Sequence, residues 1–277
     1  MNLARSTYYY QLKNRDRILA REKSDAQVKD LIDGVHIQYP YYGYRMLHAE
    51  LLRRGQLINK KKIRRIQRKF GLFAIMVRKF IRTTDSNHTH RIYPNLLKPM
   101  PTITGLNEVW VTDITYVRIE TGFVFVAIVM DLCSRKVVGY AISKRIDRQL
   151  TLGALNMAVE TRRPDVGLIH HSDRGVQYAC DDYIALMKEW KMRPSMSRRG
   201  NPYDNAFMES FMKTLKYNEI YLNHYETWND VLERIPEFIE EVYNKKRLHS
   251  SLGYLTPEEF ETNINNRKTA THLNLVD

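Results

Sequence analysis

Two acidic residues stand at positions where a carboxylate is unusual. Asp113 lies in the middle of an apolar run, VWVTDITYVRI, that has the pattern of a strand, where burying an unpaired charge is costly. Asp173 follows directly on the short apolar segment LIHHS, at a strand end, where α/β folds place their ligands. Carboxylate oxygens are the ligands that hard divalent cations take, so both acids are candidates for a metal site.

A third acid, Glu209, lies in the segment NPYDNAFMESFMKTLK, which reads as an amphipathic helix. At about 100° per residue, the polar residues that share its face are Asn205, Lys213 and Lys216. The apolar residues on the opposite face are Phe207, Phe211 and Leu215. Such a helix buries its aromatic face on a sheet and presents an acid and two lysines to a cleft, although a solvated polar face gives the same pattern.

The segments that must position these acids predict a mixed α/β sheet. Three β-rich runs joined by short turns, an antiparallel meander, occupy residues 109–119, 123–131 and 136–145. A helix, a short strand and a second helix follow at residues 150–163, 167–171 and 182–191. Strands followed by strand–helix alternation indicate a sheet covered by helices on both faces.

The positive charge is concentrated in the first third of the chain. The 277 residues carry 44 Lys+Arg and 31 Asp+Glu, and residues 1–91 alone hold a net charge of +14, against −1 for residues 92–277. This asymmetry indicates a partner with dense negative charge, because cations that neutralise phosphates release condensed counterions. A basic solubilising face is the alternative interpretation of charge alone.

Three amphipathic helices are predicted in this basic region. The first begins at a capping box made by Ser24 and Gln27, the second ends at Gly55, and the third begins at Asn59 and stops at Gly71. Their apolar faces are marked by Val28, Leu31, Ile32, Val35, Leu47, Leu51, Leu52, Ile63, Ile66 and Phe70.

The third of these helices is strongly basic, with seven cations in the ten residues from 60 to 69. An apolar stripe backed by so many cations is typical of the last helix of a helix-turn-helix, which lies in or across a DNA groove. The candidate DNA contacts are Lys61, Lys62, Arg64, Arg65, Arg68 and Lys69. A solvated helix is the alternative, and residues 81–101, which lose periodicity, predict a linker.

Other classes of protein are excluded by simple features. The longest apolar run, Phe123 to Met130, is far shorter than the roughly 20 residues of a membrane span. The N-terminus lacks the apolar stretch of a secretory signal, and Cys133 and Cys180 form no CxxC pair. We expect a folded cytoplasmic protein with no membrane partner.

Six segments, in order, resemble the transposases of bacterial insertion sequences whose second reading frame encodes a retroviral-integrase-like core, the family named for insertion sequence three. They are STYYY (6–10), YGYRMLHAELLRRG (42–55), NEVWVTDITYV (107–117), HHSDRGVQY (170–178), DNAFMESFMKTLK (204–216) and YNKKRLHSSLGYLTPEEF (243–260). In addition, 59 residues separate Asp113 from Asp173 and 35 separate Asp173 from Glu209. This spacing matches the Asp, Asp, 35 residues, Glu (DDE) signature of that superfamily.

The resemblance implies an RNase H-like α/β core with a mixed five-stranded sheet flanked by helices, its first and fourth strands adjacent. A small, basic, all-α helix-turn-helix-like domain precedes the core. The expected division of the chain is a leader (1–23), the helix-turn-helix-like region (24–80), a linker (81–104), the catalytic core (105–263) and a tail (264–277).

It also implies metal-dependent cleavage and transfer of DNA strands at insertion-sequence ends. Two Mg²⁺ ions, or Mn²⁺ in their place, would be held by three carboxylates, with Asp113 bridging both and Asp173 and Glu209 each holding one. Water is the expected nucleophile for the first cut and a DNA 3′-OH for strand transfer. The alternatives are a nuclease of the same fold and a non-catalytic or inhibitory DNA-binding product of the second reading frame.

The expected partners are double-stranded DNA, as element ends and as target, and further copies of the chain on that DNA, in a bacterial, nucleoid-associated setting. In the family the active enzyme is often a fusion whose upstream part carries a leucine zipper. This chain begins at Met1 without a heptad run, so the upstream-frame protein is a further expected partner.

Residues near the three acids and in the other motifs also have expected roles. Lys213 and Lys216 match positions that contact the donor DNA end in related integrases, and Asn205 is expected to hydrogen-bond Glu209 or its water. His170 and His171 are expected to be structural or to lie behind the metal ligands. Asp204 is expected to cap the helix N-terminus. The remaining basic run reads either as DNA contacts or as a structural cap; it comprises Lys245, Lys246 and Arg247.

Overall fold

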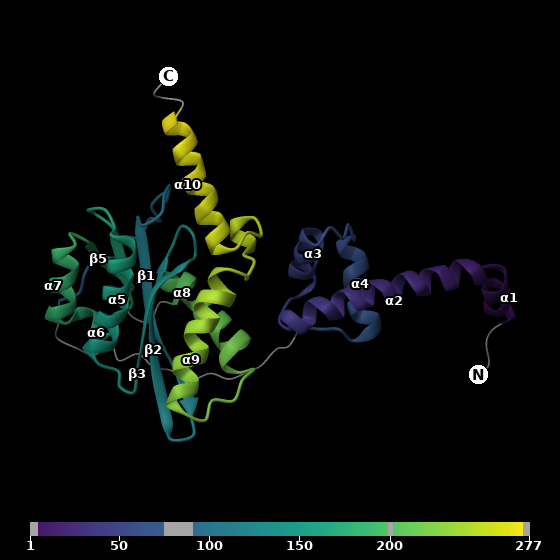
Figure 1. Cartoon of the computed structure of the whole chain (residues 1–277), viewed down its shortest axis with the longest axis horizontal. Helices are drawn as coiled ribbons and strands as arrows, with labels where there is room; N and C mark the ends of the chain where they lie inside the picture. The colour runs from purple at the N-terminus through teal and green to yellow at the C-terminus, as the bar shows by residue number, and fades with distance from the viewer. Residues whose placement is uncertain (1–4, 75–90, 199–201, 274–277) are drawn as a thin grey trace. The chain divides into compact units, whose positions relative to one another are not determined.

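The structure, a computed structural model, describes residues 5–74, 91–198 and 202–273. The chain forms two compact units, one that ends at residue 77 and one that begins at residue 78 (Figure 1). No helix among the described residues is long and apolar enough to cross a membrane.

The first unit is all helical. Its helices are α1 (Arg5–Lys13), α2 (Arg15–Gln38), α3 (Tyr44–Arg53) and α4 (Lys60–Phe70). The predicted apolar faces of the last three meet in one core, in which Ile32, Leu47, Ile63 and Ile66 are fully buried. The expected helix-turn-helix-like arrangement therefore has a real hydrophobic centre.

The predicted start of the first helix is wrong. Helix α2 begins at Arg15 after Asn14, and Ser24 lies in its interior, where its hydroxyl accepts a hydrogen bond from Lys62 Nζ (2.8 Å). Residues 15 to 24 contain neither Gly nor Pro and are rich in good helix formers, so nothing interrupts the helix at the apparent capping box. The expected leader is consequently helical wherever it is described.

The boundaries of the next two helices agree with the sequence. The Asn59 side chain accepts from the Lys61 amide, and Gly55 and Gly71 both adopt positive φ angles (75° and 70°), which cost a glycine little. Two expected core residues are exposed instead, Leu52 (49%) and Phe70 (38%). Each lies at the end of its helix, where the apolar face no longer points toward the core.

The second unit is built on a five-stranded sheet of order β3-β2-β1-β4-β5. The strands are β1 (Val109–Ile119), β2 (Gly122–Asp131), β3 (Val137–Ser143), β4 (Ile169–Ser172) and β5 (Arg193–Met196). The first three form the predicted antiparallel meander, and β4 and β5 run parallel to β1. The expected adjacency of the first and fourth strands is confirmed.

Helices cover both faces of this sheet (Figure 1). One face carries α5 (Arg148–Arg162), α6 (Val176–Ala179) and α7 (Asp181–Glu189); the other carries α8 (Ala206–Leu215) and α9 (Trp228–Glu237). Shorter helical pieces are η1 (Pro202–Asn205), η2 (Lys216–Ile220), η3 (Phe238–Asn244) and η4 (Ser250–Leu252). Along β1, Val109 and Val111 face the α8 side and Trp110 the α5 side, as strand alternation requires.

Two segments expected to be irregular are ordered. From residue 91 onward the expected linker packs on the core: Leu97 is buried, and the Leu96 amide donates to Ser195 Oγ (2.8 Å). The earlier part of that linker lies outside the described residues. Helix α10 (Pro257–Leu273) runs through the expected tail.

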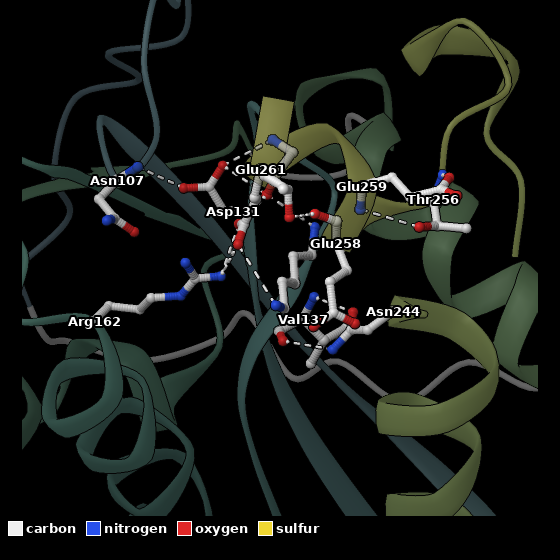
Figure 2. Close-up of polar contacts among 12 residues, drawn as sticks. Asn107, Asp131, Val137, Arg162, Asn244, Thr256, Glu258, Glu259 and Glu261 are labelled. Carbon is white, nitrogen blue, oxygen red and sulfur yellow. Dashed lines mark hydrogen bonds and ion pairs between the residues drawn. The ribbon is translucent and has the colours of Figure 1, made fainter. Parts of the chain in front are cut away.

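A buried polar network fastens α10 to the sheet (Figure 2). Arg162 donates to both carboxylate oxygens of Glu261 (2.7 and 3.0 Å), and Ser134 Oγ donates to the same group (2.7 Å). Asp131, at the end of β2, accepts from the Ser134 and Asn107 amides. These contacts join α5, the β2–β3 turn and α10.

Candidate active site

The register of two parallel strands brings the first two acids together. Val111 on β1 pairs with His171 on β4, so Asp113 and Asp173, each two residues further on, continue side by side past the end of the shorter strand. Asp113 shares the parity of Val109 and Val111, which places it on the side of the sheet that α8 covers. Two acids 59 residues apart in sequence thus become neighbours.

The environment of Asp113 opposes its negative charge. Burial raises the pKa of this carboxyl well above its usual range, and the charges of Asp173 and, more weakly, Glu209 raise it further. A hydrogen bond from the Ile114 amide (2.8 Å) and the charge of Lys216 act in the opposite direction without cancelling the rise. The site therefore has an excess of carboxylate over cation.

The loop after β4 holds Asp173 in place. Its Oδ1 accepts from the Gly175 amide (2.8 Å). A Cβ at position 175 would lie 3.0 Å from that oxygen and 2.9 Å from Gln177 Oε1, so any larger residue would force the side chains of Asp173 and Gln177 to shift. Gly175 is part of the expected HHSDRGVQY motif.

Helix α8 has the predicted amphipathic form. Phe211 and Leu215 are buried against the sheet, whereas Glu209 and Lys213 are exposed on the other face. Lys216, in the π-helical turn after α8, is half-buried, with Nζ 5.1 Å from the centre of the Tyr116 ring. Partial burial raises the pKa of Glu209 and lowers that of Lys216.

Asp173 and Glu209 influence the charge of Asp113, but the oxygens of the three acids do not all lie within reach of a single metal ion. Asp113 responds to both other acids, but the shift of the Glu209 pKa comes from burial alone, which makes Glu209 the outlying member. Among the described residues, the set with ligand atoms all within 4.8 Å of one another is instead Glu120, His224 and Glu226, all exposed. Three acids that share two ions need not all reach one ion.

The donor set fits magnesium. Carboxylate oxygens are its preferred protein ligands, usually one or two per ion with water and substrate phosphate completing the shell. The raised pKa of Asp113 marks a negative site whose carboxylates repel one another. Divalent cations held by Asp113, Asp173 and Glu209 would remove that repulsion.

The hydrogen bond that Asn205 makes runs to β1 and not to Glu209, and the expected alternative, a bond to a water on Glu209, stays a prediction. Asn205 precedes α8 with φ −128°, so it is off the helical face, and its buried side chain donates from Nδ2 to the Thr112 carbonyl (3.3 Å). Its Oδ1 is buried without a hydrogen-bond partner. Asn205 therefore ties the N-terminus of α8 to the residue that precedes Asp113.

Both histidines before Asp173 belong to the core. His170 Nε2 lies 3.1 Å from the Tyr183 hydroxyl, and His171 lies 2.8 and 3.0 Å from Ser195 Oγ and Ser197 Oγ. Burial lowers the pKa of His170 to about 3 and that of His171 to about 4, so both are neutral. Their described contacts are structural.

Asp204 is not the helix cap that the sequence suggested. It is buried and forms ion pairs with Lys98 (2.9 Å) and Arg198 (3.0 Å). The Arg198 hydrogen bond is the main reason that the pKa of Asp204 falls well below its usual range. Asp204 therefore anchors the stretch around Lys98 to the base of α8.

The basic run after η3 reads as a structural cap. Asn244 donates to and accepts from the backbone of Val137 on β3 (both 3.0 Å), Lys245 pairs with Glu241, and Leu248 is buried. Asn244 therefore ties the end of η3 to Val137, the first residue of β3.

Thr112 and Tyr178 lie near Asp113 and form part of its surroundings. Thr112 Oγ1 donates to the Ile128 carbonyl (2.7 Å) and lies 3.3 Å from the Tyr178 hydroxyl. Tyr178 is buried and its pKa is raised well above the usual value by burial and by the charge of Asp113. The position of Thr112 directly before Asp113 in the sequence was the feature from which this contact could have been predicted.

The basic helix α4 uses part of its charge within the first unit. Asp25 of α2, 1% exposed, accepts from Arg65 (2.8 and 2.5 Å) and from Lys69 (3.1 Å). Together with the Lys62–Ser24 hydrogen bond, these ion pairs hold three side chains that were expected to contact DNA against α2. Lys61, Arg64 and Arg68 are exposed, and Lys69 is exposed too (side chain 42%) although it pairs with Asp25.

Comparison with known proteins follows the same division of the chain. Family models match as an HTH-like domain over residues 23–80 and as an integrase core domain over residues 104–202 and 190–257. An insertion element IS600 protein of Shigella sonnei, described as an uncharacterized 31 kDa protein, is 38% identical over 93% of this chain and 94% of its own length. The transposase InsF for insertion sequence IS3A of Escherichia coli K12 is 36% identical over 94% of this chain and 91% of its own.

The chain belongs to the family of insertion-sequence transposases. It is a DDE-type transposase, a polynucleotidyl transferase of DNA transposition and integration, with an HTH-like DNA-binding domain. This membership disfavours the interpretation as a non-catalytic product.

Solved structures with a related fold include a chain of the simian T-cell lymphotropic virus intasome, with a TM-score of 0.48 and 16% identity over 83% of this chain and 74% of that one. Another is the HTLV-2 integrase catalytic core domain in complex with magnesium, with a TM-score of 0.43 and 13% identity over 56% of this chain and 96% of that one.

Proposed function

We propose that this transposase cuts and joins DNA at a site made by Asp113, Asp173 and Glu209, which hold divalent metal ions, Mg²⁺ or Mn²⁺, in a pair. The observation that carries the proposal is the parallel pairing of β1 with β4, which brings Asp113 beside Asp173, together with the rise in the pKa of Asp113 that burial and both other acids cause. When bound, the ions supply an activated oxygen nucleophile and stabilise charge on the entering and leaving oxygens.

The chain's own residues position the reaction. Asp113 is rigid within the sheet, Asp173 is fixed by the Gly175 turn, and Glu209 is carried on α8, so the three acids come from three separately packed elements. We assign Asp113 to both ions and the other two acids to one each. The lysines of the α8 face, Lys213 and Lys216, are proposed to contact the DNA backbone next to the reacting phosphate.

The partners follow from the chemistry of transposition. Element ends and target are double-stranded DNA, and bringing two ends together requires at least two protomers, so we propose a homo-oligomer on DNA. A protein from the upstream reading frame of the same element is a proposed additional partner. The bacterial nucleoid, in the cytoplasm, is the proposed place of action.

Strand transfer with a pre-cut donor tests this function. The purified chain is incubated with a labelled element-end duplex that carries a 3′-OH and a plasmid target, with Mg²⁺, with Mn²⁺ or with chelator. Joined product that needs both the ion and the 3′-OH supports a transposase. Cleavage without joining, also when the upstream-frame protein is present, would support a nuclease of the same fold.

A further inference from the structure

Six of the seven cations of α4 fall into two rows with different surroundings, and the seventh, Lys60, is exposed at the start of the helix. Three of them, spaced at i, i+3 and i+7, face α2: Lys62, Arg65 and Lys69. The other three have the same spacing about 100° away around the helix and are exposed: Lys61, Arg64 and Arg68. The two rows have equal formal charge, so composition alone cannot distinguish them.

The row that faces α2 is held by a buried acid. Asp25 is 1% exposed, and the hydrogen bond from Arg65 is the main cause that keeps its pKa well below the usual range, with Lys69 adding to the effect. A buried carboxylate that loses its main partner is left uncompensated, which destabilises the folded protein. Arg65 therefore cannot leave Asp25 for a DNA phosphate without a large penalty, and Lys69 is held to the same carboxylate by a second ion pair.

The exposed row continues onto α3. The Arg64 guanidinium lies 5.7 Å from the centre of the Tyr44 ring, and that of Arg45 lies 5.6 Å from the same ring. Arg45 Nε also donates to the Tyr44 hydroxyl (3.1 Å). One aromatic ring thus pre-orders two exposed guanidinium groups, which reduces the entropy lost when they bind phosphates.

We propose that duplex DNA docks on a surface made by Lys61, Arg64 and Arg68 of α4 and Arg45 of α3, here called the docking face, and that the row facing α2 makes no DNA contact. This proposal rests on the proposed DNA-binding function. The charge complementarity between four exposed cations and the phosphate backbone identifies the occupant as DNA. The Asp25 row sets the angle between α2 and α4 instead.

Neighbouring residues on α4 provide matched tests. Arg68→Gln and Lys69→Gln each remove one positive charge from adjacent positions, as do Arg64→Gln and Arg65→Gln. Binding of the full chain to a fluorescent duplex of about 30 mixed-sequence base pairs is followed by anisotropy at several salt concentrations. Melting of each variant is recorded in parallel.

We expect Arg64→Gln and Arg68→Gln each to reduce the slope of log affinity against log salt by about one, with unchanged melting. Arg65→Gln should lower the melting temperature, since Asp25 loses its main partner. Lys69→Gln keeps the Arg65–Asp25 pair, so it stays folded and should leave the slope within about 0.3 of wild type.

The outcomes separate the inference from the function on which it rests. Equal loss of slope in Arg68→Gln and Lys69→Gln, with wild type binding steeply, would overturn the docking face and leave DNA binding intact. Wild-type protein that shows no salt-dependent binding to any duplex would instead remove the DNA-binding function itself.

Discussion

At the scale of single residues, Asp113 is the most informative side chain. Burial and Asp173 raise its pKa, so between the ordinary value of about 4 and the raised folded value, the folded protein holds a proton that the unfolded chain has released. The contribution of Asp113 to stability therefore falls as pH rises through this window. A neutral amide at this position has no such dependence.

In metal-free buffer with chelator, Asp113→Asn should melt several degrees above wild type near pH 8, with a smaller difference near pH 5, since each unit of pKa shift corresponds to about 1.4 kcal/mol. Scanning calorimetry at the two pH values measures this. Added Mg²⁺ should then stabilise wild type and not the variant. A difference in melting temperature that is the same at both pH values would argue against the raised pKa.

Asn205 is a positioning residue, because its hydrogen bond runs to the Thr112 carbonyl and not to an acid. Without it, α8 is free to shift relative to β1, and a displacement near 1 Å can cost about 100-fold in rate. We expect Asn205→Ala to lower strand transfer by about 10- to 100-fold and to raise the Mg²⁺ concentration needed for half-maximal rate.

The control is Asn229→Ala, at an exposed position on α9, which should match wild type in both quantities. A purely structural role for Asn205 predicts a lower melting temperature with an unchanged Mg²⁺ dependence, and that pattern would refute positioning.

At the scale of elements, the polar network under α10 acts as its attachment (Figure 2). Glu261 is buried and accepts from Arg162 and Ser134. Removing one partner of a buried ion pair leaves the other uncompensated, so Glu261→Ala should lower the free energy of unfolding by about 3 to 5 kcal/mol.

Urea denaturation followed by circular dichroism measures this loss. Asn263→Ala on the same helix, at an exposed position, should change stability by less than about 0.5 kcal/mol. Similar losses in the two variants would show that α10 is held by something other than the Glu261 network.

The elements also show where sequence reasoning works. Runs rich in β-branched and aromatic residues, joined by short turns, predicted β1 to β3 well, because burial in the sheet reinforces these local preferences. The start of α2 was missed, because Ser24 has the local pattern of a cap while its actual partner, Lys62, is 38 residues away. The same holds for Asp204, whose partner Lys98 lies in a segment that looked like a linker.

For the site, the three candidate acids could be chosen from the sequence, whereas the contacts around them could not be predicted. Asp113 and Asp173 stood out by strand context and Glu209 by the polar face of its helix, and the family resemblance added the spacing of the three acids. The true role of Asn205 depends on a strand that is 93 residues distant in sequence, and the division of the α4 cations depends on Asp25, 40 residues from Arg65. Pairings over such separations are fixed only by tertiary packing.

At the scale of the whole molecule, the two units divide the work. The first concentrates positive charge, of which α4 exposes one row, and the second carries the three proposed carboxylate ligands, whose negative charge would repel DNA when no cation is bound. Binding to DNA should therefore be salt-dependent without metal, while cleavage and joining should need metal as well. This separation allows binding and catalysis to be measured independently.

The most direct measurement is metal-dependent cleavage of a labelled element-end duplex by wild type and by Asp113→Asn, Asp173→Asn and Glu209→Gln, each shown to be folded and to bind the duplex. The account predicts that each variant binds DNA as wild type does and loses cleavage by at least about 1,000-fold in Mg²⁺. If any of the three retains cleavage within tenfold of wild type, that acid holds no essential ion and the proposed three-carboxylate site is incorrect.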